Sequence, residues 1–119
     1  MAFDKNALIE RFKKWCYQCL DVIRTLPLNY ENKVFTNQAI RSCTSSYMNY
    51  KAACRAKSIA DMINKLKIVE EELDESIGWL EMMRDRNEGI KTDWERSEGN
   101  ELLSIVVASI RTLRTKNQN

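Results

Sequence analysis

Apolar residues recur along this chain in four segments, at alternating steps of three and four positions. That spacing places them on one face of an α-helix, with most charged residues elsewhere on the helix surface. Asp4 can cap the start of the first segment, and Pro27 marks its end because the residue before a proline avoids helical angles. The pattern predicts four helices, over residues 4–26, 33–54, 59–86 and 92–115.

The third segment has the most regular pattern, a heptad seam across some 25 residues. Ser58 precedes it as an N-cap with Asp61 three positions later, and Gly89 follows as a residue suited to left-handed backbone angles. The seam consists of Ile59, Met62, Leu66, Val69, Leu73, Ser76, Leu80 and Met83. We expect this helix to present one continuous face to the core.

The second segment carries small side chains where the other segments carry large ones. Ala39, Ser42, Cys43 and Ser46 lie at helical spacing, which permits another helix to approach closely. The same helix contains Asn49, whose amide is costly in a helix interior unless it is paired. We therefore predict a tight packing seam here, with Asn49 bonded to the backbone of a neighbouring helix.

Short connections between four amphipathic helices favour a single all-α domain over residues 1–119, an antiparallel up-and-down four-helix bundle. The chain also has more apolar residues than one such interior needs. The extra ones are Ile9, Cys16, Leu20 and Ile23 on the first helix, and Trp79, Trp94, Leu102 and Ile105 further on. This surplus favours a homo-oligomer, and the alternative is a thicker core around a bent helix.

Composition narrows the chemistry that the chain can perform. Its 119 residues include one proline, three glycines and no histidine. So few turn-formers disfavour an all-β fold. Without histidine, zinc hydrolases, Ser-His and Cys-His catalysis and His-ligated haem are excluded. We therefore predict no catalytic residue, no metal site and no cofactor, and expect a protein that is not an enzyme.

Cys16 and Cys19 have the C-x-x-C spacing of redox and metal sites. They lie within a helical apolar pattern without a second such pair, so we predict that they are buried as small apolar residues. The N-terminal residues lack the apolar region of a signal peptide, and no apolar stretch approaches the ~20 residues that span a membrane. We expect a cytoplasmic protein with reduced thiols and no membrane contact.

Three stretches carry a resemblance to a known family. Residues 41–58 read Arg-Ser-Cys-Thr-Ser-Ser-Tyr-Met-Asn-Tyr-Lys-Ala-Ala-Cys-Arg-Ala-Lys-Ser, an order of small, polar and basic residues that bundle packing alone does not demand. Together with residues 65–81 and 100–112, this run resembles the bacterial four-helix-bundle family related to proteins encoded in 23S ribosomal RNA intervening sequences.

The resemblance implies an up-and-down bundle that assembles into a closed homo-oligomer, since relatives form pentameric rings. One branch of the family, the accessory variability protein of diversity-generating retroelements, works beside a reverse transcriptase and binds nucleic acid through a basic surface. RNA, DNA or a nucleic-acid enzyme such as a reverse transcriptase are therefore the implied partners. The chain departs from the family at Tyr47-Met48, where many members have Pro or Gly, and at Ala52-Ala53, where many have Glu-Gly.

The net charge of +2 divides unevenly, into +6 for residues 1–60 and −4 for residues 61–119. Clustered cations bind a phosphate backbone by releasing its counterions, and nearby aromatic rings can stack on bases. Tyr47 and Tyr50 are the candidates for stacking. The candidate phosphate-binding residues are Arg41, Lys51, Arg55 and Lys57. The alternative for all of them is an ordinary solvated surface, and Arg41 could instead have a structural role.

The third predicted helix also carries an acidic run. Its candidates for docking a basic protein are Glu70, Glu71, Asp74 and Glu75. Di-iron bundles pair such carboxylates with Glu-x-x-His motifs, which this chain cannot supply. Two functions therefore stay open: an oligomeric accessory protein that contacts nucleic acid, or a scaffold that binds proteins and no nucleic acid.

Overall fold

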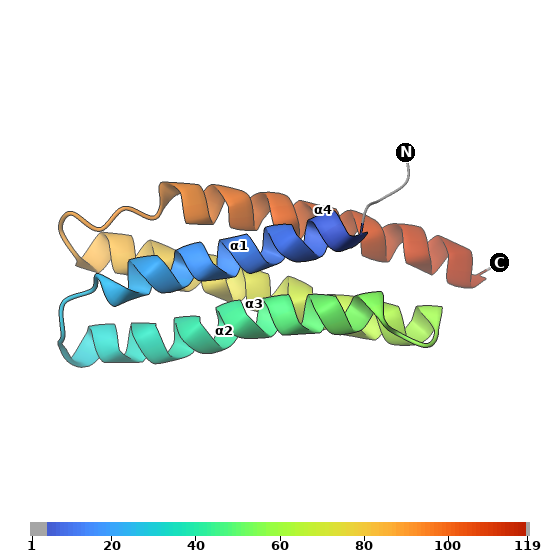
Figure 1. Cartoon of the computed structure of the whole chain (residues 1–119), viewed down its shortest axis with the longest axis horizontal. Helices are drawn as coiled ribbons and strands as arrows, with labels where there is room; N and C mark the ends of the chain where they lie inside the picture. Colours follow the sequence, from blue (N-terminus) through green and yellow to red (C-terminus); the bar gives the residue numbers. More distant parts are fainter. Residues whose placement is uncertain (1–4, 119) are drawn as a thin grey trace.

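The computed structural model describes residues 5–118, which form an all-α four-helix bundle. The helices run alternately up and down the long axis, as Figure 1 shows. Each helix packs against the next one in the chain, and the first also meets the last, so that all of them surround one core. Their bounds are α1 Lys5–Arg24, α2 Tyr30–Cys54, α3 Ile59–Arg86 and α4 Asp93–Gln118.

The helix bounds differ from the predicted ones around the first connection and at the end of α4, which runs to Gln118 rather than to residue 115. α2 begins at Tyr30 because Asn29 is its N-cap, whose side-chain oxygen accepts a hydrogen bond from the Asn32 amide at 2.8 Å. α1 ends at Arg24, since Thr25 and Leu26 already form shorter-range bonds to carbonyls three residues back. The predicted cap Asp4 lies outside the described residues.

The bounds of α3 coincide with the predicted range. Ser58 accepts a hydrogen bond from the Asp61 amide at 3.1 Å, as expected of an N-cap. Gly89 has a φ of 84°, which glycine adopts without the steric cost that a Cβ would bring. Ile59, the first residue of the predicted seam, is exposed, because the first turn of α3 extends past the packed interior.

The predicted small-residue seam is confirmed, because the four small residues of α2 are all fully buried. Its polar members are satisfied: the Ser76 hydroxyl of α3 donates to the Ser42 hydroxyl at 2.8 Å, and Ser46 donates to the Ser42 carbonyl at 2.8 Å. Short side chains that bond to one another or to their own helix allow α2 and α3 to pack closely.

A glycine permits a second close approach, at the centre of the bundle. A Cβ on Gly99 of α4 would lie 3.2 Å from Cγ1 of Ile77 and 3.3 Å from Nε1 of Trp15. Trp15 is fully buried and its Nε1 donates to the Glu95 carbonyl of α4 at 2.9 Å. Gly99 therefore gives the indole room to reach the α4 backbone.

Several residues that the sequence suggested for a subunit interface belong to the core of this chain. Cys16, Ile23 and Leu102 are 2%, 5% and 0% exposed, so assigning them to another subunit is wrong. α1 has neighbours on both sides, α2 and α4, and therefore buries a wider face than one stripe. Trp94, by contrast, is exposed.

Two further expectations meet different outcomes. Cys16 and Cys19 are both buried and free, which confirms that the C-x-x-C pair packs as small apolar residues. The expectation for Asn49 is wrong: its amide donates to the carbonyl of Ser45 at 2.9 Å, one turn back in the same helix. A half-buried amide at the helix surface reaches its own backbone at less entropic cost than a neighbouring helix.

No helix of the described residues is long and apolar enough to cross a membrane.

Candidate nucleic-acid interface

One end of the bundle collects cations from all helices, because α1 and α3 begin there while α2 and α4 end there (Figure 1). We call this the basic end and define it as residues 5–9, 51–67 and 106–118. Among these described residues it carries a single acidic side chain, Asp61. Its cations are Lys5, Lys51, Arg55, Lys57, Lys65, Lys67, Arg111, Arg114 and Lys116.

The charges of the basic end are almost all without an acidic partner. Lys65 pairs with Asp61, its Nζ lying 3.0 Å from Oδ1. The other eight cations have no ion pair with any carboxylate of the described chain. Lys51 instead lies over the ring of Tyr47, 5.5 Å from its centroid. A cluster of like charges without counter-charges repels itself and attracts anions.

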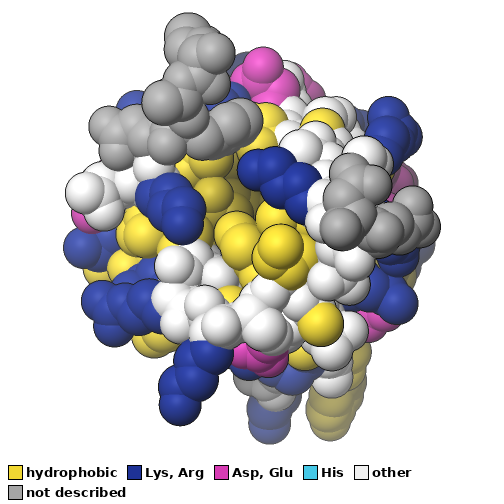
Figure 2. Space-filling model, turned by 90° about the vertical axis from the view of Figure 1, so that its right-hand side faces the viewer, with side chains coloured by type: hydrophobic (Ala, Val, Ile, Leu, Met, Phe, Trp, Pro, Cys, Tyr) yellow, Lys and Arg dark blue, Asp and Glu magenta, His cyan; other side chains and the backbone are white. Residues whose placement is uncertain are grey.

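The basic end also contains an apolar groove of about 560 Å³. Its apolar walls come from Ile105 and Leu113 of α4, Met62 of α3 and Tyr50 of α2, with Lys5 and Lys116 among its polar lining. Viewed end-on in Figure 2, hydrophobic side chains occupy the middle of this end, and Lys and Arg side chains surround them.

The groove follows from the register of α1 against α4. Arg11 bonds to both Glu98 and Glu101 at 2.8 Å, which places it level with the turn between them. Lys5, six residues earlier, then lies level with about residue 105 of α4 in this antiparallel pair. α4 therefore continues for roughly 20 Å past the first described turn of α1, at 1.5 Å per residue. Over that length its inner face lacks α1 as a neighbour.

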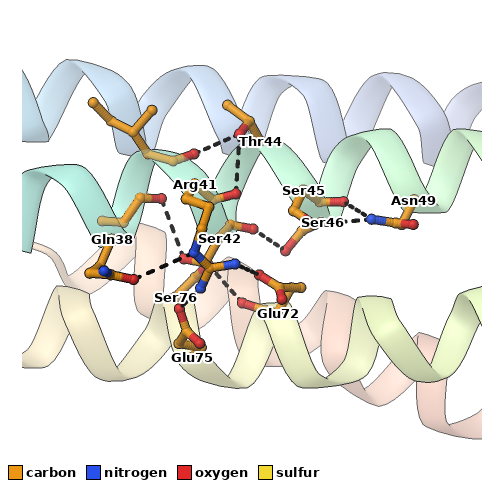
Figure 3. A network of polar contacts seen from close by, with 12 residues as sticks. Gln38, Arg41, Ser42, Thr44, Ser45, Ser46, Asn49, Glu72, Glu75 and Ser76 are labelled. Carbon is orange, nitrogen blue, oxygen red and sulfur yellow. Dashed lines mark hydrogen bonds and ion pairs between the residues drawn. The ribbon is translucent and has the colours of Figure 1, made fainter.

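Arg41 does not belong to the basic end, although the sequence grouped it with the other three candidates. It precedes Lys51 by ten residues, or about 15 Å along α2. Its guanidinium bonds to Glu72 at 2.9 Å and also to Glu75, as Figure 3 shows. Two carboxylates neutralise this charge, so Arg41 ties α2 to α3, which favours its structural role over phosphate binding.

The structure separates the two tyrosines that were predicted to stack on bases. Tyr50 is only 7% exposed, and its ring stacks on Phe12 with centroids 4.3 Å apart and planes at 13°. Burial, with Cys54 alongside, raises the pKa of its hydroxyl. The stacking role predicted for Tyr50 is therefore wrong, because its ring faces are part of the core. Tyr47 is half-buried beneath Lys51.

The acidic candidates of α3 also differ in whether they have partners within the chain. Glu75 bonds to Arg41 and accepts a hydrogen bond from Nε1 of Trp79 at 3.2 Å, so it serves contacts within the chain. Glu70, Glu71 and Asp74 have no ion pair with any cation of residues 5–118. Within that range no group of three or more His, Cys, Asp or Glu side chains is placed to hold a metal ion.

Sequence reasoning missed the contribution of the chain termini to this interface. Lys5, Arg111, Arg114 and Lys116 join the candidates of α2 only because the bundle brings the start of α1 and the end of α4 to the same end. One signal was present: residues 102–119 contain three cations and no acidic residue.

Comparison with known proteins supports the class that this fold defines. No family model matches the chain, and no curated protein matches it. It is similar to the crystal structure of a protein of unknown function from the S23 ribosomal protein family, from Bacteroides thetaiotaomicron VPI-5482. The two share 28% sequence identity with a TM-score of 0.75, over 90% of this chain and 97% of the other. This likeness supports a relation to the bundle family associated with 23S ribosomal RNA intervening sequences.

Proposed function

We propose that this chain is a non-enzymatic accessory protein that binds nucleic acid through its basic end. The observation that carries the proposal is the set of eight cations, contributed by all four helices to one end of the bundle, that form no ion pair within residues 5–118. Such a cluster lowers stability by self-repulsion, so packing gives no reason for it. A polyanion would supply the missing counter-charges.

The mechanism is counterion release. Each phosphate that a Lys or Arg neutralises frees condensed cations, so the logarithm of affinity falls linearly with the logarithm of salt concentration, by about 0.9 per phosphate on duplex DNA. Lys51, Arg55 and Lys57 lie within seven residues, at the end of α2 and in the connection that follows. The interface therefore favours sequence-independent, strongly salt-sensitive binding.

The test compares two triple variants with the same change in net charge. Lys51→Gln, Arg55→Gln and Lys57→Gln together remove three cations of the basic end, whereas Arg24→Gln, Lys33→Gln and Lys91→Gln remove three exposed cations of the opposite end. Fluorescence anisotropy with labelled RNA and DNA is followed from 0.05 to 0.3 M salt. We expect the affinity of the first variant to fall at least about tenfold. The slope of log affinity against log salt concentration should become shallower by about two to three.

The control should stay within about twofold of the wild-type affinity, because its cations lie far from the proposed interface. An equal loss in both variants would mean that only net charge matters, and the basic end would not be an interface. No salt-dependent binding below about 100 µM would overturn the proposal entirely.

Homo-oligomerisation belongs to the same proposal, with a pentamer implied by the family resemblance. It is supported by large apolar side chains on the surface, among them Leu28 and Tyr30, which are almost fully exposed. A ring would multiply the basic ends available to one nucleic acid. Light scattering in solution tests this, and a mass near 14.0 kDa would contradict it.

The second candidate function is a protein scaffold that docks a basic partner on α3. It is favoured by Glu70, Glu71 and Asp74, which form no ion pair with any cation in the part of the chain that the structure describes. A nucleic-acid enzyme such as a reverse transcriptase is the partner implied by resemblance. The variant Glu71→Gln with Asp74→Gln should weaken capture of such a partner and leave nucleic-acid affinity unchanged, whereas the basic-end variant should do the reverse.

A further inference from the structure

The groove of the basic end indicates which form of nucleic acid it would accept, an inference that rests on the proposed function. We infer that the basic end prefers single strands, with a base entering the groove beside α4 while phosphates contact the surrounding cations. The juxtaposition of an apolar groove with lysines along it carries this inference.

The groove offers apolar surface that a duplex cannot cover. Met62 of α3 and Ile105 and Leu113 of α4 line the groove and are only half-buried. A duplex stacks its bases inside and presents phosphates and narrow base edges to a protein. A single strand exposes the faces of its bases, and burying them removes apolar surface from water.

Charge complementarity places the strand along the same groove. Lys5 at the start of α1 and Lys116 near the end of α4 both line it, and both lack a carboxylate partner among the described residues. A ligand that combines apolar bases with an anionic backbone matches both parts. The cavity volume of about 560 Å³ lies within the range of pockets that enclose small organic groups.

The polar side chains of the groove indicate weak discrimination between bases. Ser109 donates its hydroxyl to the Ile105 carbonyl at 2.8 Å, which leaves its oxygen able to accept. Thr112 adds another hydroxyl to the lining. Ser109 can then accept from a base N–H, whereas a hydroxyl such as that of Thr112 can donate or accept, and neither selects one base edge. Binding should therefore depend on unpaired bases more than on their sequence.

Electrostatics alone predicts the opposite preference, which makes the inference sharply testable. A duplex has a higher charge density than a single strand and releases more counterions per phosphate contact. A protein that uses only cations therefore favours the duplex. A preference for the single strand requires contact with the bases.

The experiment measures the affinity of the full chain for one labelled, unstructured oligonucleotide in three forms at the same salt concentration. The forms are the single strand, the same strand paired with its complement, and a strand of equal length with abasic sites. We expect the single strand to bind about fivefold more tightly than either other form, the lower bound for one base contact. The variant Leu113→Gln should abolish that preference, whereas Leu103→Gln, on the same helix but outside the groove lining, should retain it.

Circular dichroism of both variants shows that the bundle still folds. Equal or tighter duplex binding that still depends on Lys51, Arg55 and Lys57 would overturn this inference and leave the proposed function standing. A single-strand preference that Leu113→Gln does not alter would also overturn it, because the groove would then hold another occupant, such as a second copy or an acidic helix. Absence of binding to every form would overturn both.

Discussion

The two ends of the bundle differ in how many of their charged side chains form ion pairs. The end opposite the basic end, residues 20–34 and 81–96, carries six Lys or Arg and seven Asp or Glu. Four arginines there form ion pairs: Arg24 with Asp21, Arg84 with Asp85, Arg86 with Glu31, and Arg96 with Asp93. At the basic end one cation of nine is paired within the described chain. We call the opposite end the paired end.

The two ends also differ in the contacts of their buried side chains. The paired end is closed by a reciprocal amide pair, in which Nδ2 of Asn32 donates to Asn87 at 2.8 Å and Nδ2 of Asn87 donates back at 2.9 Å. These amides also bond to the carbonyls of Pro27 and Met83, which joins the first connection to the end of α3. The basic end has an apolar groove instead. The arginines and the buried amides of the paired end thus have partners within the chain, whereas most cations of the basic end form no ion pair within the described residues.

The largest expected effect is the loss of stability when the amide pair of the paired end is broken. Asn87→Ala leaves Oδ1 and one N–H of the Asn32 side chain, which is 2% exposed, without partners, while its bond to the Pro27 carbonyl remains. We expect a loss of roughly 2–3 kcal/mol in the free energy of unfolding, measured by urea denaturation. Asn100→Ala, at an exposed position of α4, should change stability little. A similarly small loss for Asn87→Ala would show that the paired end does not depend on this contact.

The next effect concerns the connection that closes the paired end. Gly89→Ala places a Cβ at a φ of 84°, although no atom lies within 4 Å to clash with it. We expect backbone strain alone to lower the free energy of unfolding by about 1 kcal/mol. Gly78→Ala, inside α3 and equally free of contacts, should stabilise by roughly 0.5–1 kcal/mol through helix propensity. Thermal melts of the two variants should therefore shift in opposite directions.

At the basic end, a charge reversal should raise stability. α1 has no acidic residue in its described first turn, whereas α2, α3 and α4 have Glu31, Asp61 and Asp93 there. Lys5→Glu would complement the helix dipole and relieve repulsion from Lys116, a gain of about 0.5–1 kcal/mol at low salt. Raising salt to about 0.5 M should shrink the gain by screening. The same variant should bind nucleic acid more weakly, which would separate function from stability at this end.

The smallest effect lies between the two ends, at Glu98 of α4. Hydrogen bonds from Arg11, at 2.8 and 2.9 Å, hold the pKa of Glu98 below its ordinary value. Its stabilisation is therefore present above the unfolded pKa of about 4.3 and is lost as the pH falls through the lower folded pKa. We expect this partly exposed pair to contribute about 0.5 kcal/mol to the free energy of unfolding. Glu98→Gln should remove that part of the acid dependence in urea titrations at pH 3 to 7. An unchanged dependence would contradict the assignment.

Much of the fold could be predicted because its determinants are local. The bounds of α3 followed from Ser58 and from the seam, and the close packing of α2 followed from its small residues. The start of α2 was missed because Asn29 and Asn32 are both good caps, and only the packed structure shows that Asn32 is instead buried against Asn87. Competing local signals are decided by tertiary contacts.

The candidate site was predicted only in part. Lys51, Arg55 and Lys57 could be grouped because they follow one another in sequence. Sequence alone could not choose between a phosphate-binding and a structural role for Arg41, because its partners Glu72 and Glu75 lie more than thirty residues away on α3. Tyr50 was misassigned for the same reason, since the Phe12 ring that covers it belongs to α1.

The sequence by itself determined the order of the four helices, the cap of α3 and the main apolar face of each helix. These features depend on hydrogen bonds between residues four apart and on a period of 3.6, and both concern residues close in sequence. Only the tertiary structure decided which charges are neutralised and which remain for a partner. Ion pairs depend on the register and direction of helices packed side by side, and these bring Arg41 to Glu75 but leave Lys5, Lys57 and Lys116 together at one end without a carboxylate partner in the described chain.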